Sequence, residues 1–410
     1  MLRKIAAFAS GNVIVQIIPF IFYPIIARIF SVDDFGLLAL FAAITSACSY
    51  FLTFQYMPAI VKCEKSEITS LVSISLFSSF IVSLILVGVS GYYLPLVNED
   101  FSRLFEIKNI ELFLVIFLVM STFIEIKSFT YVRDGKFTHI TLINLFKVIC
   151  LYSVLLIFRN NEHILILSQV ASLVMAVAFI FVFKSGVSVS LDLSAAKYIL
   201  KKYSEFPKYR IPHAVFDVIS VQGIIFFITI FYGLVEVAIF TMVTKLLRMP
   251  INVVFSAIAK VIYSELCGEK KSIGFGRDVR LYLLLGLVFL FSFFILYLFG
   301  HSIFVFVLGD KWSMSGELAE SFSFMYMFLS LSIALSFVPA ALGKQKHFLW
   351  ITTVGNLLIL STVLISGSLG IEFSEFGVYY SVTASVVYIS YFIFNIYILV
   401  TNNGIKLAEK

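Results

Sequence analysis

Two positive charges lie in the middle of an otherwise apolar stretch of this sequence. The segment MVTKLLRMPINVV (242–254) places Lys245 and Arg248 three residues apart and Pro250 two residues further on. On a helix, this spacing puts both cations and Asn252 on one face. Arginine offers a fork of N–H donors and lysine a mobile point charge, so the pair is suited to bind an anion such as phosphate or pyrophosphate. Pro250 removes one backbone hydrogen bond and is expected to kink the helix.

Five other ionisable side chains fall within apolar segments: Arg28, Glu125, Lys127, Lys147 and Asp217. A charge at the centre of a membrane helix costs on the order of 3 kcal/mol, so such residues usually face a protein interior or a wet cavity. Lys147, like Lys245, lies near the middle of its segment, which favours a functional role. Arg28 and Lys127 are near enough to an end to extend to the headgroups. Glu125 is expected to pair with a neighbouring cation, and Asp217 with a lysine of the preceding linker, unless they hold a coupling ion.

The composition identifies the solvent around these charges. The 410-residue chain is 60% hydrophobic and only 13% charged, and it contains 46 phenylalanines. A soluble domain has too little interior to hide so much apolar surface, so the sequence predicts an all-α membrane protein. The cysteines are scattered, no histidine cluster accompanies them, and the net charge of +6 is not gathered into a nucleic-acid-binding run. We therefore expect no metal, no cofactor and no nucleic-acid partner.

Hydrophobic runs of membrane-spanning length predict about twelve helices. Residues 184–212 divide them into two halves, an N-terminal six-helix bundle at 1–183 and a C-terminal six-helix bundle at 213–410. Within this linker, SLDLSAAKYILKKYSEF places Leu193, Ala196, Leu200 and Tyr203 on one helical face, which predicts an amphipathic helix on the membrane surface. The predicted spans are 5–30, 36–58, 70–93, 110–131, 138–158, 163–183, 213–233, 235–261, 279–300, 317–338, 348–366 and 375–400.

The distribution of Lys and Arg predicts the orientation. If both termini are cytoplasmic, the extracytoplasmic loops contain only Arg103, Lys108, Arg159 and Lys311, and most of the other cations outside the spans are cytoplasmic. Short cytoplasmic loops of membrane proteins are enriched in Lys and Arg, so this orientation is the expected one.

The halves also resemble each other weakly, since IFSVDDFGLLALF (29–41) and IFYGLVEVAIF (230–240) occupy corresponding positions. Transporters are often built from two repeated bundles with the binding site between them. The sequence has no GK[ST] phosphate loop, no GxSxG and no HExxH. We therefore expect a transporter rather than an enzyme, driven by an ion gradient or by the gradient of its own substrate.

Three segments resemble the Wzx-type polysaccharide or O-antigen flippases of the multidrug/oligosaccharidyl-lipid/polysaccharide exporter superfamily. The opening GNVIVQIIPFIFYPIIARIFSVDDFGLLALF (11–41) is similar to their first span and the turn after it. AIFTMVTKLLRMPINVVFSAIAKVIYSEL (238–266) resembles their eighth span, where a basic residue precedes a Leu-x-x-Pro segment. Residues 306–347 are similar to the loop and span that follow their ninth helix.

The resemblance implies two six-helix bundles around a central cavity in the inner (plasma) membrane of a bacterium. It implies translocation of an undecaprenyl-pyrophosphate-linked oligosaccharide, such as an O-antigen repeat unit for lipopolysaccharide, from the cytoplasmic to the periplasmic leaflet. The family's cationic cavity corresponds to Arg28, Lys147, Lys245 and Arg248. Our hypothesis is that the last three bind pyrophosphate and Arg28 acts near the exit. Asp217 or Glu125 would bind H+ or Na+, and polysaccharide-assembly proteins are expected partners besides membrane lipid.

Two other functions remain open at this stage. A multidrug or small-molecule cation antiporter would share the fold but should carry a net acidic cavity, whereas the buried charges here are mostly positive. A membrane enzyme of the O-antigen polymerase type usually needs a large external loop with arginines. No external loop between the spans predicted here exceeds about twenty residues.

Overall fold

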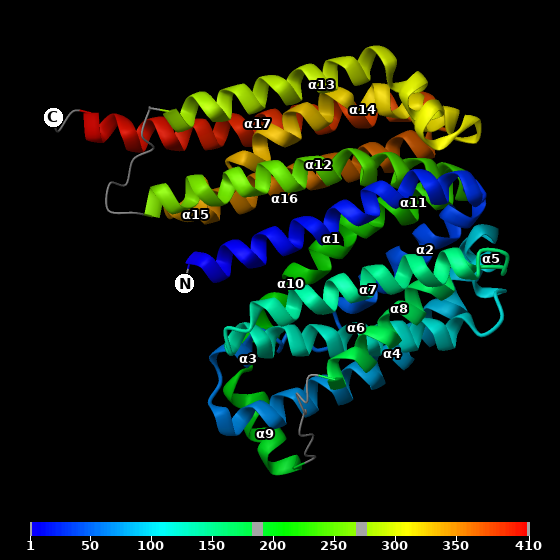
Figure 1. Cartoon of the computed structure of the whole chain (residues 1–410), viewed down its shortest axis with the longest axis vertical. Coiled ribbons are helices and arrows are strands. Elements are labelled where there is room, and N and C mark those ends of the chain that lie inside the picture. The colour runs from blue at the N-terminus through cyan, green and yellow to red at the C-terminus, as the bar shows by residue number, and fades with distance from the viewer. Residues whose placement is uncertain (1, 183–191, 268–276, 408–410) are drawn as a thin grey trace. The chain divides into compact units, whose positions relative to one another are not determined.

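All regular structure in the described part of the chain is helical (Figure 1). The computed structural model describes residues 2–182, 192–267 and 277–407. Within these ranges, 11 helical segments are long and apolar enough to cross a membrane, and Val13–Ile29 of the first helix is a shorter apolar segment. This confirms the predicted all-α membrane fold with about twelve spans.

The chain forms two compact units, which we describe separately. The first consists of Met1–Ile26 and Asp33–Leu234, and the second of Ala27–Val32 and Val235–Lys410. The division into bundles at 1–183 and 213–410 stays a prediction. The long helices of the first unit are α1 (Leu2–Ile29), α2 (Val32–Ser49), α4 (Ile68–Val97), α6 (Ile110–Arg133), α7 (Phe137–Ile157), α8 (Ile164–Val182), α10 (Glu205–Asp217) and α11 (Gly223–Phe231). Its short helices are α3 (Ala59–Lys62), η1 (Lys65–Glu67), α5 (Glu99–Phe105), α9 (Leu193–Lys202) and the π-helix η2 (Val218–Gln222).

A row of serines allows close helix packing on α4. Ser75, Ser79 and Ser83 recur every four residues and are fully buried. The hydroxyls of Ser79 and Ser83 donate to the carbonyls of Leu76 and Phe80 at 2.8 and 2.9 Å, within their own helix. Small side chains whose hydroxyls are satisfied in this way let neighbouring helices approach closely in lipid, where no hydrophobic force drives helices together. Helix α6 contacts both α4 and α8 in this unit.

The linker helix α9 packs against the protein through Ile199, and Tyr203, which follows α9, packs against the same cluster. Ile199 is buried and joins a cluster with Tyr56, Met57 and Leu71, whereas the predicted face residue Leu200 is 39% exposed. Helix α4 is a neighbour of α9, and the contact of α9 with the membrane surface stays a prediction. The first part of the predicted linker, residues 184–191, lies outside the described residues.

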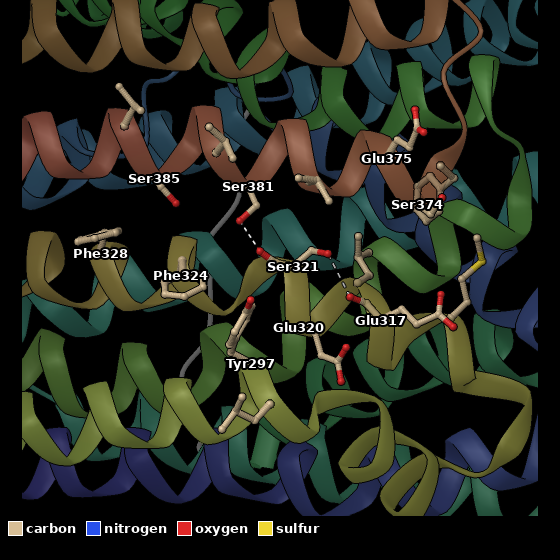
Figure 2. Close-up of a pocket in the computed structure, with 17 residues that line it drawn as sticks. Tyr297, Glu317, Glu320, Ser321, Phe324, Phe328, Ser374, Glu375, Ser381 and Ser385 are labelled. Carbon is tan, nitrogen blue, oxygen red and sulfur yellow. Dashed lines mark hydrogen bonds between the residues drawn. The ribbon is translucent and has the colours of Figure 1, made fainter.

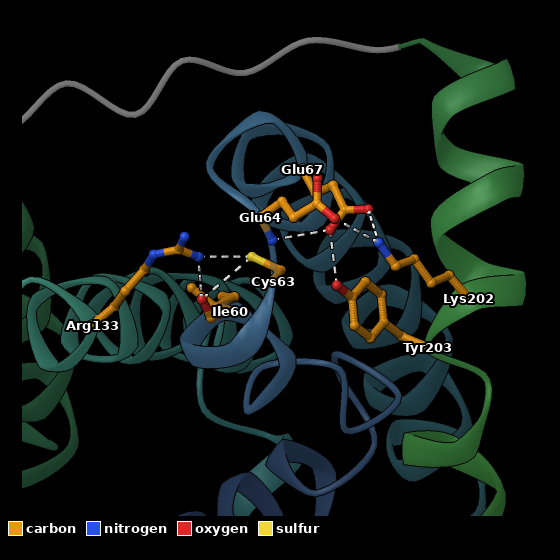
Figure 3. Close-up of polar contacts among 7 residues, drawn as sticks. All are labelled: Ile60, Cys63, Glu64, Glu67, Arg133, Lys202 and Tyr203. Atoms are coloured by element: carbon orange, nitrogen blue, oxygen red, sulfur yellow. Dashed lines mark hydrogen bonds and ion pairs between the residues drawn. The ribbon is translucent and has the colours of Figure 1, made fainter.

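Polar contacts attach the end of α9 to the turn before α4 (Figure 3). Lys202 Nζ lies 2.6 Å from Glu67 Oε1, and the Tyr203 hydroxyl donates to Glu67 Oε2 at 2.8 Å. The hydrogen bond to Glu67 raises the pKa of Lys202, and burial together with the same carboxylate raises the pKa of Tyr203 to about 12. Both groups therefore keep their protons at neutral pH, so the contact stays intact there.

A second contact in the same region holds the short helix α3. The Arg133 guanidinium donates to the Ile60 carbonyl at 2.8 Å and to Cys63 Sγ at 3.0 Å (Figure 3). Arginine near a helix C-terminus satisfies carbonyls that have no partner within the helix. Because α3 and α6 are joined in this way, the segment between α2 and α4 is anchored to α6.

The second unit contains the remaining helices, and two glycines bring α13 and α14 close together. A Cβ on Gly316 would lie 2.5 Å from the Cα of His301, and one on Gly300 would lie 2.6 Å from the Glu320 side chain. Helix α14 also contacts α17, and α16 contacts α17 (Figure 1). The helices of this unit are α12 (Leu234–Cys267), α13 (Arg277–Leu308), η3 (Asp310–Trp312), α14 (Ser313–Ala334), α15 (Val338–Ala341), α16 (Gln345–Ser368) and α17 (Phe373–Leu407).

Candidate functional site

Lys245, Arg248 and Asn252 line one pocket on α12, as their spacing predicts. Thr244 and Met249 complete its lining, and the pocket has a volume of about 260 Å³. Arg248 is exposed and Lys245 is partly buried. The helix is continuous on both sides of Pro250. The pocket therefore presents a guanidinium, an ammonium and an amide together, a set of donors that can hold a phosphate group.

Three tyrosines from two other helices lie near this pocket, and the sequence reasoning missed them. The charge of Arg248 acts on Tyr326 of α14 and on Tyr380 and Tyr388 of α17. The Tyr326 hydroxyl donates to the Thr244 carbonyl at 3.5 Å. Tyr326 and Tyr380 are buried and Tyr388 is partly buried, so Tyr388 is the one of the three whose hydroxyl is best placed to contact a hydroxyl-rich ligand. The available signal was a set of tyrosines in the interior of predicted spans.

Tyr326 and Tyr380 belong to a cluster of aromatic rings. The ring centroid of Tyr380 lies 5.4 Å from those of Phe240 and Phe322, and Phe240 and Phe322 are 5.8 Å apart. Pairs in these arrangements add about 0.5–1.5 kcal/mol each beyond the burial of their area. This cluster joins α12, α14 and α17 beside the pocket.

Lys147 lies in the other unit. It is partly buried on α7, next to Phe146, whose ring stacks on Phe179 with a centroid distance of 4.2 Å. No hydrogen bond or ion pair involves Lys147 among the described residues. Its role in one anion site together with Lys245 and Arg248 stays a prediction.

Arg28 has a structural role at the end of α1. Its guanidinium donates through Nε to the Val307 carbonyl at 3.2 Å and through Nη2 to the Phe306 carbonyl. These carbonyls belong to the last turn of α13, where no intrahelical N–H is available. A positive charge there also interacts favourably with the helix dipole. Arg28 therefore caps α13, and its predicted contact with substrate stays a prediction.

The capping is reciprocal. Lys311 Nζ donates to the carbonyl of Arg28 at 3.2 Å and to that of Phe30, and the Trp312 indole N–H donates to the Ala27 carbonyl at 3.0 Å. Trp312 is fully buried. Arg28 of α1 thus caps the C-terminal end of α13, and Lys311 and Trp312, which follow α13, cap the C-terminal end of α1.

Asp217 pairs with a histidine rather than with a linker lysine. Its Oδ2 lies 3.0 Å from His213 Nδ1, one helical turn earlier on α10. The π-helix η2 begins at the next residue, Val218. Single π-helical turns are rare and often mark functional sites in helical proteins.

Glu125 is exposed on α6, and no described residue forms an ion pair with it. Lys127, two residues further on, is 2% exposed. Residues two apart on a helix point in different directions, so Glu125 and Lys127 do not face each other. The predicted ion-coupling roles of Asp217 and Glu125 stay predictions.

The fold is similar to solved membrane transporters. The lipid II flippase MurJ in an inward closed conformation aligns with a TM-score of 0.68 and 12% identity, covering 95% of this chain and 87% of that chain. An inward-facing MATE multidrug resistance transporter of the MOP superfamily aligns with a TM-score of 0.57 and 14% identity, covering 96% and 94%. The eukaryotic MATE transporter AtDTX14 gives 0.56 and 14%, covering 96% and 95%. At such identities the likeness concerns the fold alone.

The sequence comparison is more specific. A search of curated proteins returns no match. A family model described as "Polysaccharide biosynthesis protein" matches residues 25–317, a range that includes the α12 pocket and all six predicted site residues. Together with the MurJ-like and MATE-like fold, this match makes the chain a membrane-spanning member of the polysaccharide biosynthesis protein family.

Proposed function

We propose that this protein is a flippase for a lipid-linked oligosaccharide. It moves an undecaprenyl-pyrophosphate-linked repeat unit, such as an O-antigen unit, from the cytoplasmic to the periplasmic leaflet of a bacterial inner membrane by alternating access. The observation that carries the proposal is the pocket on α12, where Lys245, Arg248 and Asn252 present their donors within a membrane span. Membership of a polysaccharide biosynthesis family and a fold similar to that of a lipid II flippase support the same substrate class.

The chemistry of the pocket suits the part of such a substrate that is hardest to move. A pyrophosphate carries its charges on oxygens that accept hydrogen bonds, and leaving water without new partners would cost several kcal/mol. Arg248 can bind two of those oxygens at once, while Lys245 follows the group as a mobile charge. The hydroxyl of the partly buried Tyr388 offers a partner to the first sugar.

The other predicted residues have defined parts in this proposal. Lys147 supplies a further positive charge from the N-terminal half. Arg28 contributes near the periplasmic exit in addition to capping α13. Asp217 or Glu125 binds H+ or Na+ and couples its gradient to the conformational change, since an acidic side chain within a span is costly unless it has a partner.

The test removes the two charges in the bacterium that makes the polysaccharide. We expect the double substitution Lys245→Ala and Arg248→Ala to reduce surface polysaccharide at least tenfold and to increase the lipid-linked intermediate, at unchanged protein level. Lys260→Ala is the matched control, because Lys260 is exposed on the same helix and does not line the pocket. Normal surface polysaccharide in the double variant would refute the proposal.

The similarity to MATE transporters supports a second candidate, a multidrug or other small-molecule cation antiporter. A cationic substrate would be repelled by the pocket on α12, so neutralising that pocket should improve export of a cationic dye rather than abolish it. Dye export that depends on this protein, with surface polysaccharide unaffected by its deletion, would favour the antiporter.

A further inference from the structure

A groove runs between α13, α14 and α17 (Figure 2), and it shares no lining residue with the α12 pocket. Its volume is about 980 Å³, which is at the upper end of the range of roughly 300–1,000 Å³ for small-molecule sites. All three helices belong to the second unit and contact one another in sequence, α13 with α14 and α14 with α17. The groove is therefore a property of this unit by itself.

One end of the groove is acidic. Glu317, Glu320 and Glu375 lie toward the same end of the groove, at the beginnings of α14 and α17 (Figure 2). Glu320 Oε1 accepts a hydrogen bond from the His301 backbone N–H at 2.8 Å, whereas Glu317 and Glu375 are exposed. No lysine or arginine is among the lining residues. Three carboxylates at the rim of an apolar groove leave a negative charge that a cation would neutralise.

The rest of the groove is apolar and faces outward. Val378, Val382 and Val386 recur every four residues along α17 and are 49%, 58% and 58% exposed. On the opposite wall, Phe324 is 42% exposed and Leu298 is 51% exposed. Side chains in this pattern present a continuous apolar strip to the surroundings.

The length of this strip matches one leaflet of a bilayer. From Glu317 to Phe328, and likewise from Glu375 to Val386, is eleven residues, or about 17 Å at 1.5 Å per residue. The hydrocarbon of one leaflet is about 15 Å deep. A ligand that fills the groove thus has a charged head at one membrane face and an apolar chain reaching about to the bilayer centre.

We propose that the groove binds a membrane phospholipid whose headgroup ends in a primary ammonium. The ammonium lies among the three glutamates and one acyl chain lies along the valines of α17. A primary ammonium donates three hydrogen bonds, which carboxylate oxygens accept. The phosphate of this lipid stays in water beside the rim; a headgroup with a phosphate but no ammonium is repelled, and a choline headgroup has no N–H to donate. The site is separate from the proposed transport function, because a groove without cations does not suit a pyrophosphate.

The test measures lipid retention and no transport. The full-length protein is placed in nanodiscs containing equal parts of phosphatidylethanolamine, phosphatidylcholine and phosphatidylglycerol, and the lipids that remain bound are identified by native mass spectrometry. We expect phosphatidylethanolamine to be enriched at least fivefold over both others. Glu317→Gln with Glu375→Gln should abolish this enrichment. Asp310→Asn with Glu372→Gln is the matched control, because both residues are exposed and lie outside the groove; it should retain the enrichment.

A second variant examines the chain-binding part. Val382→Trp fills the groove but leaves the glutamates in place, and we expect it to reduce bound lipid of every headgroup. Equal retention of the three lipids by the unmodified protein would overturn the proposal, as would full phosphatidylethanolamine enrichment in the double glutamine variant. Loss of enrichment in the control pair would also overturn it, because general surface charge would then be the cause.

Discussion

Arg28 and Arg248 are both arginines of membrane spans, yet their surroundings differ. Arg28 directs its N–H groups to two carbonyls at the end of α13. Arg248 is exposed in a pocket beside a lysine and an asparagine. A guanidinium that already donates to two carbonyls keeps fewer N–H groups for a ligand, whereas one that faces a pocket can exchange water for phosphate oxygens. The contacts of Arg28 and Arg248 therefore differ, although both residues lie in apolar segments of the sequence.

Replacing Arg28 therefore tests a structural role. We expect Arg28→Ala to reduce the free energy of unfolding by about 1–2 kcal/mol, because two helix carbonyls and the dipole of α13 lose a charged donor. The measurement is thermal unfolding of the purified protein in detergent. Arg159→Ala is the control, because Arg159 is exposed in a loop. Unchanged stability, with reduced surface polysaccharide per folded molecule, would show that Arg28 acts on substrate instead.

At the level of elements, the packing of α13 against α14 depends on glycines, which have no side chain, at the point where the two helices approach closely. Gly316 meets the backbone of His301, which cannot move aside as a flexible side chain would. Close approach between helices is the main source of their association within lipid. The acidic end of the groove lies at this contact, since Glu317 and Glu320 flank the same turn of α14.

We expect Gly316→Ala to destabilise the protein by about 1–3 kcal/mol, because the added methyl group forces the two helices apart. Gly286→Ala, on α13, is the matched control: a Cβ there meets nothing within 4 Å. That substitution should be neutral or stabilising by about 0.5–1 kcal/mol, since alanine is the better helix former. Both values follow from unfolding curves measured in the same detergent. Equal effects of the two substitutions would contradict the role assigned to Gly316.

The elements themselves were largely predictable from the sequence, because a lipid solvent imposes long apolar helices and little else. The contacts of individual residues were less predictable, because the periodicity of the sequence does not specify which helices are neighbours. Helix α9 buries Ile199 in a cluster that includes Leu71 of α4, a contact that the amphipathic pattern alone does not specify. Asp217 pairs with His213, one turn earlier on its own helix, rather than with a lysine of the preceding linker.

For the site, spacing along one helix was sufficient for Lys245, Arg248 and Asn252, which do share a pocket. Residues from separate helices could not be joined in this way. Tyr326, Tyr380 and Tyr388 come near Arg248 through the packing of α14 and α17, and no spacing in the sequence encodes that packing. The groove with the three glutamates was missed for the same reason.

At the scale of the whole molecule, the charge distribution makes a prediction about orientation. Loops rich in Lys and Arg are expected on the cytoplasmic side, so Lys346 should be cytoplasmic and Lys108 periplasmic. In a variant without the four native cysteines, Lys108→Cys should react in intact cells with a membrane-impermeant maleimide, and Lys346→Cys should react only after the cells are opened. The reverse pattern would invert the proposed direction of transport.

The buried Trp312 also makes the protein its own optical probe. The chain contains two tryptophans, and both belong to the second unit: Trp312 is fully buried and bonded to Ala27, and Trp350 is 72% exposed at the start of α16. Intrinsic fluorescence excited at the indole band therefore reports on that unit alone. Brominated lipids should quench the emission of Trp350 and spare that of Trp312. The quenched part of the emission would then report contact with the bilayer, and the remaining part would report whether the junction between α1 and α13 is intact.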